Sequence, residues 1–126
     1  MGNLKLLAVE DNPANMAYLS FLLKKLDISV VPASSGEMGL ELLAGETVDG
    51  MLVDINLGAG MTGIQMMEKV REMTEYKDVP MIAVTAYYGG GLDKELVQKG
   101  FSSFLSKPFS LDQLKDALSN FFDIST

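Results

Sequence analysis

Five polar side chains stand where apolar runs of the sequence end. Glu10 and Asp11 follow the first run, Asp54 and Thr85 each close another, and Lys107 comes just after a fourth. Carboxylates crowded together without a cation repel one another, whereas a hard divalent ion with oxygen ligands removes that cost. These residues therefore predict a metal site. Mg²⁺ is the natural ion for it, and Mn²⁺ is the alternative.

The same side chains are suited to handling a phosphoryl group. A magnesium site of this sparse, open kind commonly shares its remaining positions with a phosphoryl oxygen. Lys107 would pair with a second phosphoryl oxygen, and the Thr85 hydroxyl would donate a hydrogen bond to a third. Asp54 would then be the nucleophile.

Each of these residues also has a purely structural interpretation. A single Asp after a strand is usually a helix N-cap or a turn residue, and an isolated Lys is a solvated cation. The functional interpretation depends on whether the fold brings all of them to one edge.

Strand-like and helix-like segments alternate along the chain. Apolar runs at 4–9, 28–31, 48–53, 79–84 and 101–105 predict buried strands. Apolar residues at helical spacing follow each run, at 16–26, 38–43, 64–70, 92–99 and 111–121. Five strands alternating with five helices predict a parallel sheet covered on both faces, with its ligand crevice at the carboxyl ends of the strands.

Local signals mark several helix ends. Asn12-Pro13 supplies an N-cap followed by a proline at the first helical position. Capping boxes are predicted at Ser34–Glu37, Thr62–Gln65 and Ser110–Gln113, and Gly100 predicts the end of the fourth helix.

Composition narrows the function further. A length of 126 residues with 48% apolar residues predicts one domain over residues 1–126. The net charge of −7 disfavours direct binding to nucleic acid, and zero Cys and zero His exclude disulfides, imidazole ligands and a phosphohistidine within this chain. The short N-terminal apolar run is too brief for a signal sequence or a membrane span, which predicts a soluble, cytoplasmic protein without membrane contact.

These segments resemble the receiver domain of two-component response regulators, in the CheY-like superfamily. The pieces that carry the resemblance are Val9-Glu10-Asp11-Asn12, Leu52-Val53-Asp54-Ile55-Asn56, Thr85-Ala86 and Phe104-Leu105-Ser106-Lys107-Pro108-Phe109. They occur in the family's order and span about the whole chain. The Gly-rich loop at 58–63 resembles that of receivers associated with hybrid histidine kinases.

The resemblance implies a flavodoxin-like, doubly wound sheet with strand order 2-1-3-4-5. It also implies that Asp54 is phosphorylated and is a direct metal ligand together with Asp11. Asn56 would contribute its backbone carbonyl to the metal, and Glu10 would bind it through water. The Lys107–Pro108 peptide bond would be cis.

A switch is implied as well. Thr85 would move toward the phosphoryl group and Phe104 would turn inward, changing the output face formed by the fourth helix, the fifth strand and the fifth helix. A simple core aromatic is the alternative for Phe104. Asn56 and Tyr87 resemble the positions that tune the rate of hydrolysis. The run Gly89-Gly90-Gly91 is either part of a movable output face or a loose loop without a purpose.

The leading hypothesis is therefore a signalling module and not an enzyme in the ordinary sense. It would take a phosphoryl group from a histidine kinase or a histidine phosphotransfer protein, and would catalyse only its own phosphorylation and dephosphorylation. A stand-alone receiver and one domain of a hybrid kinase both fit the sequence.

Two other functions compete with it. A phosphohydrolase of the haloacid dehalogenase kind needs a second acid where Asn56 stands. A scaffold that is never phosphorylated is disfavoured, because Asp11, Asp54 and Lys107 are all present.

Overall fold

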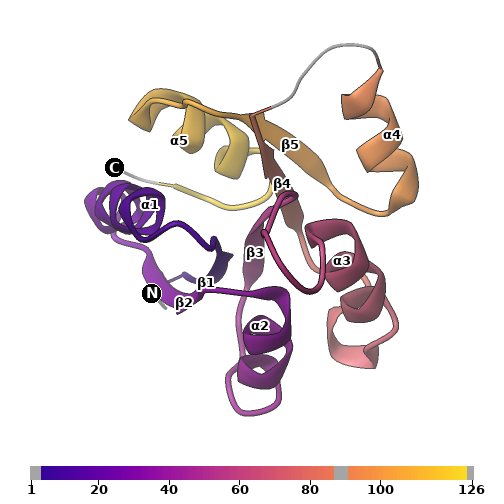
Figure 1. The fold of residues 1–126 in the computed structure, drawn as a ribbon. Coiled ribbons are helices and arrows are strands. Elements are labelled where there is room, and N and C mark those ends of the chain that lie inside the picture. The colour runs from indigo at the N-terminus through magenta and orange to yellow at the C-terminus, as the bar shows by residue number, and fades with distance from the viewer. Residues whose placement is uncertain (1–3, 87–90, 125–126) are drawn as a thin grey trace.

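Five parallel strands form a single sheet in the computed structural model, which describes residues 4–86 and 91–124. The strands are β1 (Lys5–Val9), β2 (Ser29–Ala33), β3 (Gly50–Asp54), β4 (Met81–Thr85) and β5 (Ser103–Ser106). Their order across the sheet is β2-β1-β3-β4-β5 (Figure 1). The predicted α/β class and the strand order 2-1-3-4-5 are confirmed.

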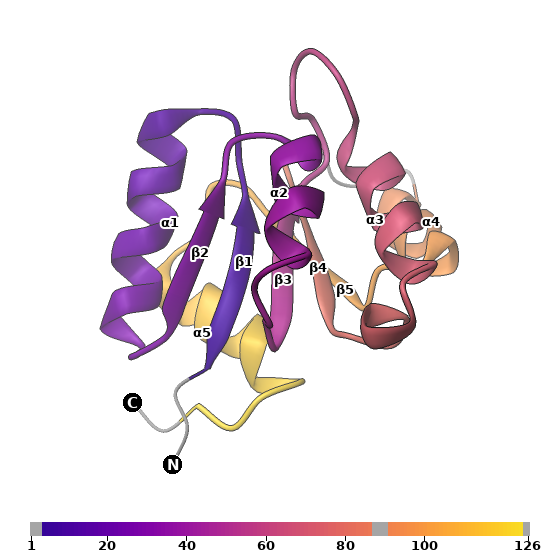
Figure 2. The same cartoon turned by 90° about the horizontal axis from the view of Figure 1, so that it is seen from below.

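Helices cover both faces of the sheet (Figure 2). Helices α1 (Pro13–Lys25) and α5 (Leu111–Ser119) lie on one face, and α2 (Gly36–Leu43), α3 (Gly63–Arg71) and α4 (Leu92–Lys99) lie on the other. A short 3₁₀ helix, η1 (Thr74–Tyr76), follows α3. Within the described ranges, no helix is long and apolar enough to cross a membrane.

The register of the strands aligns the residues that end them. Val9 lies beside Val53, Asp54 beside Val84, and Thr85 beside Ser106. Because all the strands are parallel, these positions share the carboxyl edge of the sheet. The side chains that the sequence places after each strand are therefore brought to one edge, where doubly wound folds bind ligands.

The two faces are packed with different side chains. The core beneath α1 and α5 contains leucines such as Leu23, Leu52 and Leu114, together with Ile, Val, Ala and Phe, and its fully buried members include no methionine. The core beneath α2, α3 and α4 has four buried methionines, namely Met51, Met66, Met67 and Met81. The interior is thus branched and aliphatic on one face and rich in flexible thioether chains on the other.

Several helix ends follow their local signals. Asn12 caps α1 ahead of Pro13. Capping boxes are present at Thr62–Gln65 before α3 and at Ser110–Gln113 before α5, and Gly100 ends α4 with φ +136°. In each case a side chain or a glycine within one turn satisfies the free backbone groups of the helix terminus.

The predicted capping box at Ser34–Glu37 is wrong by one residue. Ser35 is the N-cap of α2, and its hydroxyl accepts a hydrogen bond from the backbone N–H of Met38. The Glu37 carboxylate turns away from its own helix terminus and accepts from the backbone N–H of Met61, 24 residues along the chain. A tertiary contact has overridden the local one.

Several predicted boundaries also differ by one to a few residues, and three of them have a clear cause. The first helix ends at Lys25, because the backbone N–H of Leu26 already closes it. The fifth strand begins at Ser103 and not at Phe101, since the backbone N–H of Phe101 donates to the Leu96 carbonyl to close α4. Phe121 lies beyond the end of α5 and is 36% exposed, so it does not belong to the apolar stripe of that helix.

Arg71 ties α3 to its neighbours, and the sequence gives no sign of this. Its guanidinium donates to the carbonyls of Gly100 (3.0 Å), Tyr76 (3.0 Å) and Val79 (2.6 Å). Burial is the main influence on its pKa and lowers it, while nearby Asp78 opposes that change. One planar fork therefore holds the C-terminal end of α4 and the segment around η1 against α3.

Candidate functional site

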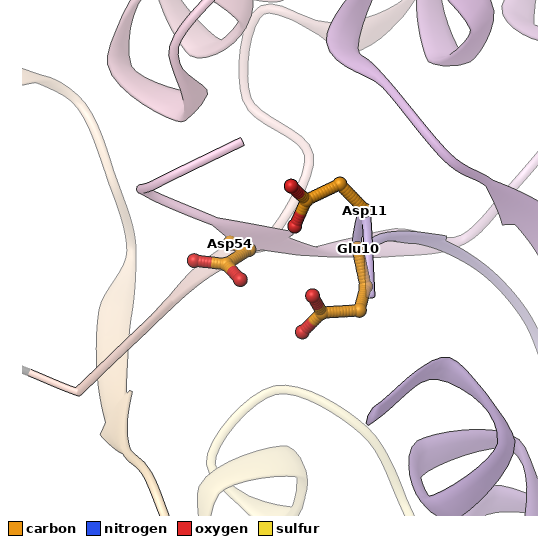
Figure 3. A group of neighbouring side chains, drawn as sticks. All are labelled: Glu10, Asp11 and Asp54. Atoms are coloured by element: carbon orange, nitrogen blue, oxygen red, sulfur yellow. The ribbon is translucent and has the colours of Figure 1, made fainter. Parts of the chain in front are cut away.

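The polar residues at the strand ends converge at the carboxyl edge of the sheet. Glu10 and Asp11 follow β1, and Asp54 is the last residue of β3, in the strand beside it. Their carboxylates point toward a common space (Figure 3). One oxygen from each of the three lies within 4.8 Å of the others. The convergence that the strand pattern predicts is present.

Burial and backbone hydrogen bonds fix two of these carboxylates. Glu10 and Asp54 are each only 5% exposed, while Asp11 is open to solvent. The backbone N–H of Asn56 donates to Asp54 Oδ1 (3.0 Å), and that of Asn12 donates to Glu10 Oε2 (3.0 Å). These amides hold the side chain of each acid in place. The sequence gives no sign of this role, because any residue type other than proline would supply it through its backbone N–H.

Lys107 joins the two buried carboxylates. Its Nζ lies 2.7 Å from Glu10 Oε1 and 2.7 Å from Asp54 Oδ2. Its backbone N–H donates to the carbonyl of Thr85 (2.8 Å), which aligns β5 with β4 at this edge. The Lys107–Pro108 peptide bond is cis.

The charges around Lys107 change its proton affinity. Burial by itself would lower the pKa of the ammonium group. The hydrogen bonds and charges of Asp54 and Glu10 outweigh burial, so the pKa is raised above its usual value. Lys107 therefore carries its positive charge at neutral pH.

The donor set is suited to a hard divalent cation. Three carboxylates face a single ammonium group, so negative charge remains after Lys107 has formed its two ion pairs. The acidic groups that converge here offer oxygen, and the exposed Asp11 leaves an open side where water could complete the coordination. Asp11, Asp54 and the Asn56 carbonyl are the groups that would hold Mg²⁺ here, with Glu10 acting through water.

Other predicted residues lie on β4, on β5 and before α4, or outside the described residues. Thr85, at the end of β4, is 1% exposed. Phe104 on β5 is half-buried and packs against the methionine-containing core. Tyr87, Gly89 and Gly90 lie outside the described residues, whereas Gly91 directly precedes α4 with φ +82°.

A cleft of about 290 Å³ leads to Asp54 and Lys107. Its walls are mostly apolar and include Leu19, Leu52 and Val84, and Tyr18 of α1 lies at its side. The Tyr18 hydroxyl donates to the carbonyl of Phe109 (2.7 Å), which joins α1 to the segment before α5. The acidic centre is thus accessible along α1.

The chain belongs to the response regulator receiver domain family, whose model matches residues 6–119. It is a receiver domain of the kind used in phosphorelay systems, and domains of this family bind Mg²⁺ at an acidic site. The predicted family is confirmed. The assignment to a signalling domain also removes the support for a phosphohydrolase of the haloacid dehalogenase kind.

Similar proteins include the receiver segments of sensor kinases. The chain is 32% identical over 112 residues to the signal transduction histidine-protein kinase BarA of Escherichia coli (strain K12), a match covering 89% of this chain and 12% of BarA. The chain thus spans about an eighth of the length of that relative.

Solved structures of other proteins have the same fold as this chain. The chemotaxis protein CheY4 of Vibrio cholerae superposes with a TM-score of 0.89 at 26% identity, covering 96% of this chain and 100% of CheY4. The receiver domain of the sensor histidine kinase PA1611 from Pseudomonas aeruginosa, solved with a magnesium ion in its active site cleft, gives 0.85 at 28% identity, covering 95% and 98%.

Proposed function

We propose that this domain accepts a phosphoryl group on Asp54 from the phosphohistidine of a histidine kinase or a histidine phosphotransfer protein. The observation that carries the proposal is the convergence of Glu10, Asp11 and Asp54 within 4.8 Å, with Lys107 bound to two of them, in a chain of the receiver family. The similarity to histidine kinases such as BarA supports a donor of this kind.

The transfer is a displacement at phosphorus. A carboxylate oxygen of Asp54 attacks, a P–O bond forms, and the P–N bond to the donor imidazole breaks with its electron pair remaining on nitrogen. Lys107 exchanges its ion pair with Asp54 for one with a phosphoryl oxygen. Mg²⁺, when bound, neutralises charge on the phosphoryl oxygens. Later attack by water on phosphorus breaks the P–O bond to Asp54, releases inorganic phosphate and restores the carboxylate, so the domain would catalyse its own phosphorylation and dephosphorylation.

The output is a change of surface. Thr85, the buried last residue of β4, would donate its hydroxyl to the phosphoryl group, and half-buried Phe104 would turn further inward. The face formed by α4, β5 and α5 would then be presented to a protein target in the cytoplasm. Asn56 and Tyr87 would set the rate of hydrolysis, and residues 1–126 would act as one domain.

Intact mass spectrometry after incubation with acetyl phosphate and Mg²⁺ tests the proposal. We expect the native chain to gain one phosphoryl group, and we expect no gain with Asp54→Asn or after addition of EDTA, because the nucleophile or the metal is then missing. A gain by Asp54→Asn equal to that of the native chain would show that another residue is phosphorylated. No gain by native chain that circular dichroism shows to be folded would favour the scaffold function.

A further inference from the structure

The connection between β3 and α3, here called the β3–α3 loop (residues 55–62), forms one wall of the acidic site. Its two ends meet where the backbone N–H of Gly63 donates to the carbonyl of Ile55 (3.0 Å). At Gly58, which has φ +68°, a Cβ atom would lie 2.9 Å from Asp11 Oδ2. The loop also contains Asn56. Its conformation therefore determines how the Asn56 carbonyl and Asp11 lie relative to Asp54.

The far side of this loop is held by the first turn of α2. Glu37 Oε2 accepts a hydrogen bond from the backbone N–H of Met61 (3.0 Å). Gly60 has φ +90°, and a Cβ there would lie 2.9 Å from Glu37 Oε2, so the loop backbone passes directly against this carboxylate. The Met61 sulfur in turn packs against Gly36, at 3.1 Å from a Cβ built there. Helix and loop interlock through backbone as well as side-chain atoms.

We propose that Glu37 is a positioning residue for the magnesium site. By binding the Met61 amide, it holds the β3–α3 loop in the conformation that places the Asn56 carbonyl and Gly58 beside the acidic centre. Glu37 would touch neither the metal nor the phosphoryl group. The inference rests on the proposed function only in so far as Asp11, Asp54 and Asn56 hold the ion.

A simpler role for Glu37 is stabilisation of its own helix, because a carboxylate in the first turn interacts favourably with the helix dipole. The geometry distinguishes the two roles. Ser35 already caps α2, so Glu37 is not required there. A dipole role needs the negative charge, whereas the positioning role needs an oxygen that accepts from Met61. Glu37→Gln removes the charge and keeps the acceptor.

Three variants make the test, namely Glu37→Ala, Glu37→Gln and, as a matched control, Glu41→Ala. Glu41 is an exposed acid on the same helix, and within the described residues its side chain has no hydrogen bond or ion pair. Mg²⁺ affinity is measured by calorimetry, since the chain has no Trp. We expect Glu37→Ala to weaken Mg²⁺ binding by roughly threefold to tenfold, and the other two variants to stay within about twofold of the native chain.

A second readout needs no metal. Hydrogen exchange of the Met61 amide, measured without Mg²⁺, should accelerate in Glu37→Ala and stay unchanged in Glu41→Ala, because only the first variant loses the hydrogen bond. Unchanged Mg²⁺ affinity in Glu37→Ala would overturn the inference, as would equal weakening in Glu37→Ala and Glu37→Gln. Neither result depends on phosphorylation. Failure of the native chain to accept phosphate would count against the proposed function and not against this positioning role.

Discussion

Helices α4 and α5 follow neighbouring strands, yet they are anchored to the fold in different ways. Ser110 and Gln113 close a capping box at the start of α5, which packs on the leucine-rich face of the sheet. Helix α4 begins at Gly91 in a left-handed conformation without a side-chain cap, and its neighbours on that face include the four buried methionines. Helix α5 thus has a side-chain cap over a core without buried methionine, whereas α4 has no such cap and lies over a core that mixes methionines with branched chains.

This difference indicates where the domain can rearrange at low cost. Methionine is unbranched and adapts to irregular space, so a core that contains it repacks more easily than one built from leucine. Phe104, the residue of the proposed switch, packs against the methionine-containing core. In the proposed switch, the α4 end of the α4–β5–α5 face would therefore repack at lower cost than the α5 end.

Truncation in the two cores should show the largest effect. Leu114 and Met67 are both fully buried, one on each face. We expect Leu114→Ala to fall in the upper part of a range of roughly 2–5 kcal/mol and Met67→Ala in the lower part, because the remaining methionines can fill part of the cavity. Urea unfolding followed by circular dichroism measures both. An equal loss, or the reverse order, would remove the proposed contrast between the faces.

Arg71 should matter next, because it is the main polar tether of the adaptable side. Arg71→Lys keeps the charge but cannot serve the carbonyls of Gly100, Tyr76 and Val79 together, so we expect a loss of about 1.5–3 kcal/mol. Hydrogen exchange near the end of α4 should accelerate. Lys69→Arg, an exposed change on the same helix, is the control. A variant as stable as the control would show that α4 does not depend on this tether.

The helix starts should give the smallest effects. Ser110→Ala should lower the free energy of unfolding by about 1 kcal/mol, because the N–H of Gln113 loses its acceptor, and Ser110→Thr should restore most of that stability.

Gly91→Ala should lower the free energy of unfolding by roughly as much for another reason, because the residue has a φ of +82°, and Gly91→Asn should restore part of that stability. Thermal unfolding measures all four. A Gly91→Ala variant as stable as the native chain would show that the first turn of α4 adapts freely.

How far the sequence predicts this fold is visible at the helix ends. The boxes at Thr62–Gln65 and Ser110–Gln113 depend on atoms within one turn, so the local pattern is sufficient. The box predicted at Ser34–Glu37 fails because Met61, distant in sequence, competes for the carboxylate. The start of the fifth strand fails for a similar reason, since Phe101 is used to close α4.

The candidate site likewise has a part that the sequence pattern predicts and a part that depends on distant contacts. Glu10, Asp54, Thr85 and Lys107 are predictable as neighbours, because each stands at a strand end and parallel strands end at one edge. The contacts of Arg71 and Glu37 are not predictable from the sequence. A charged residue near a helix end gives the same sequence pattern whether its side chain meets solvent or a backbone group elsewhere in the fold. Only the packing of the loops selects its partner.

The methionines of the α2–α4 face also provide built-in spectroscopic probes. Met61 lies against Gly36, Met66 against Gly39 and Met67 against Gly100. Their methyl groups therefore report on the contact of the β3–α3 loop with α2, of α3 with α2, and of α3 with the end of α4. The chain has nine methionines, few enough for a methyl-labelled spectrum to be assigned one substitution at a time. Such a spectrum, recorded while acetyl phosphate and Mg²⁺ are added, would show which helix responds first in an otherwise unaltered protein.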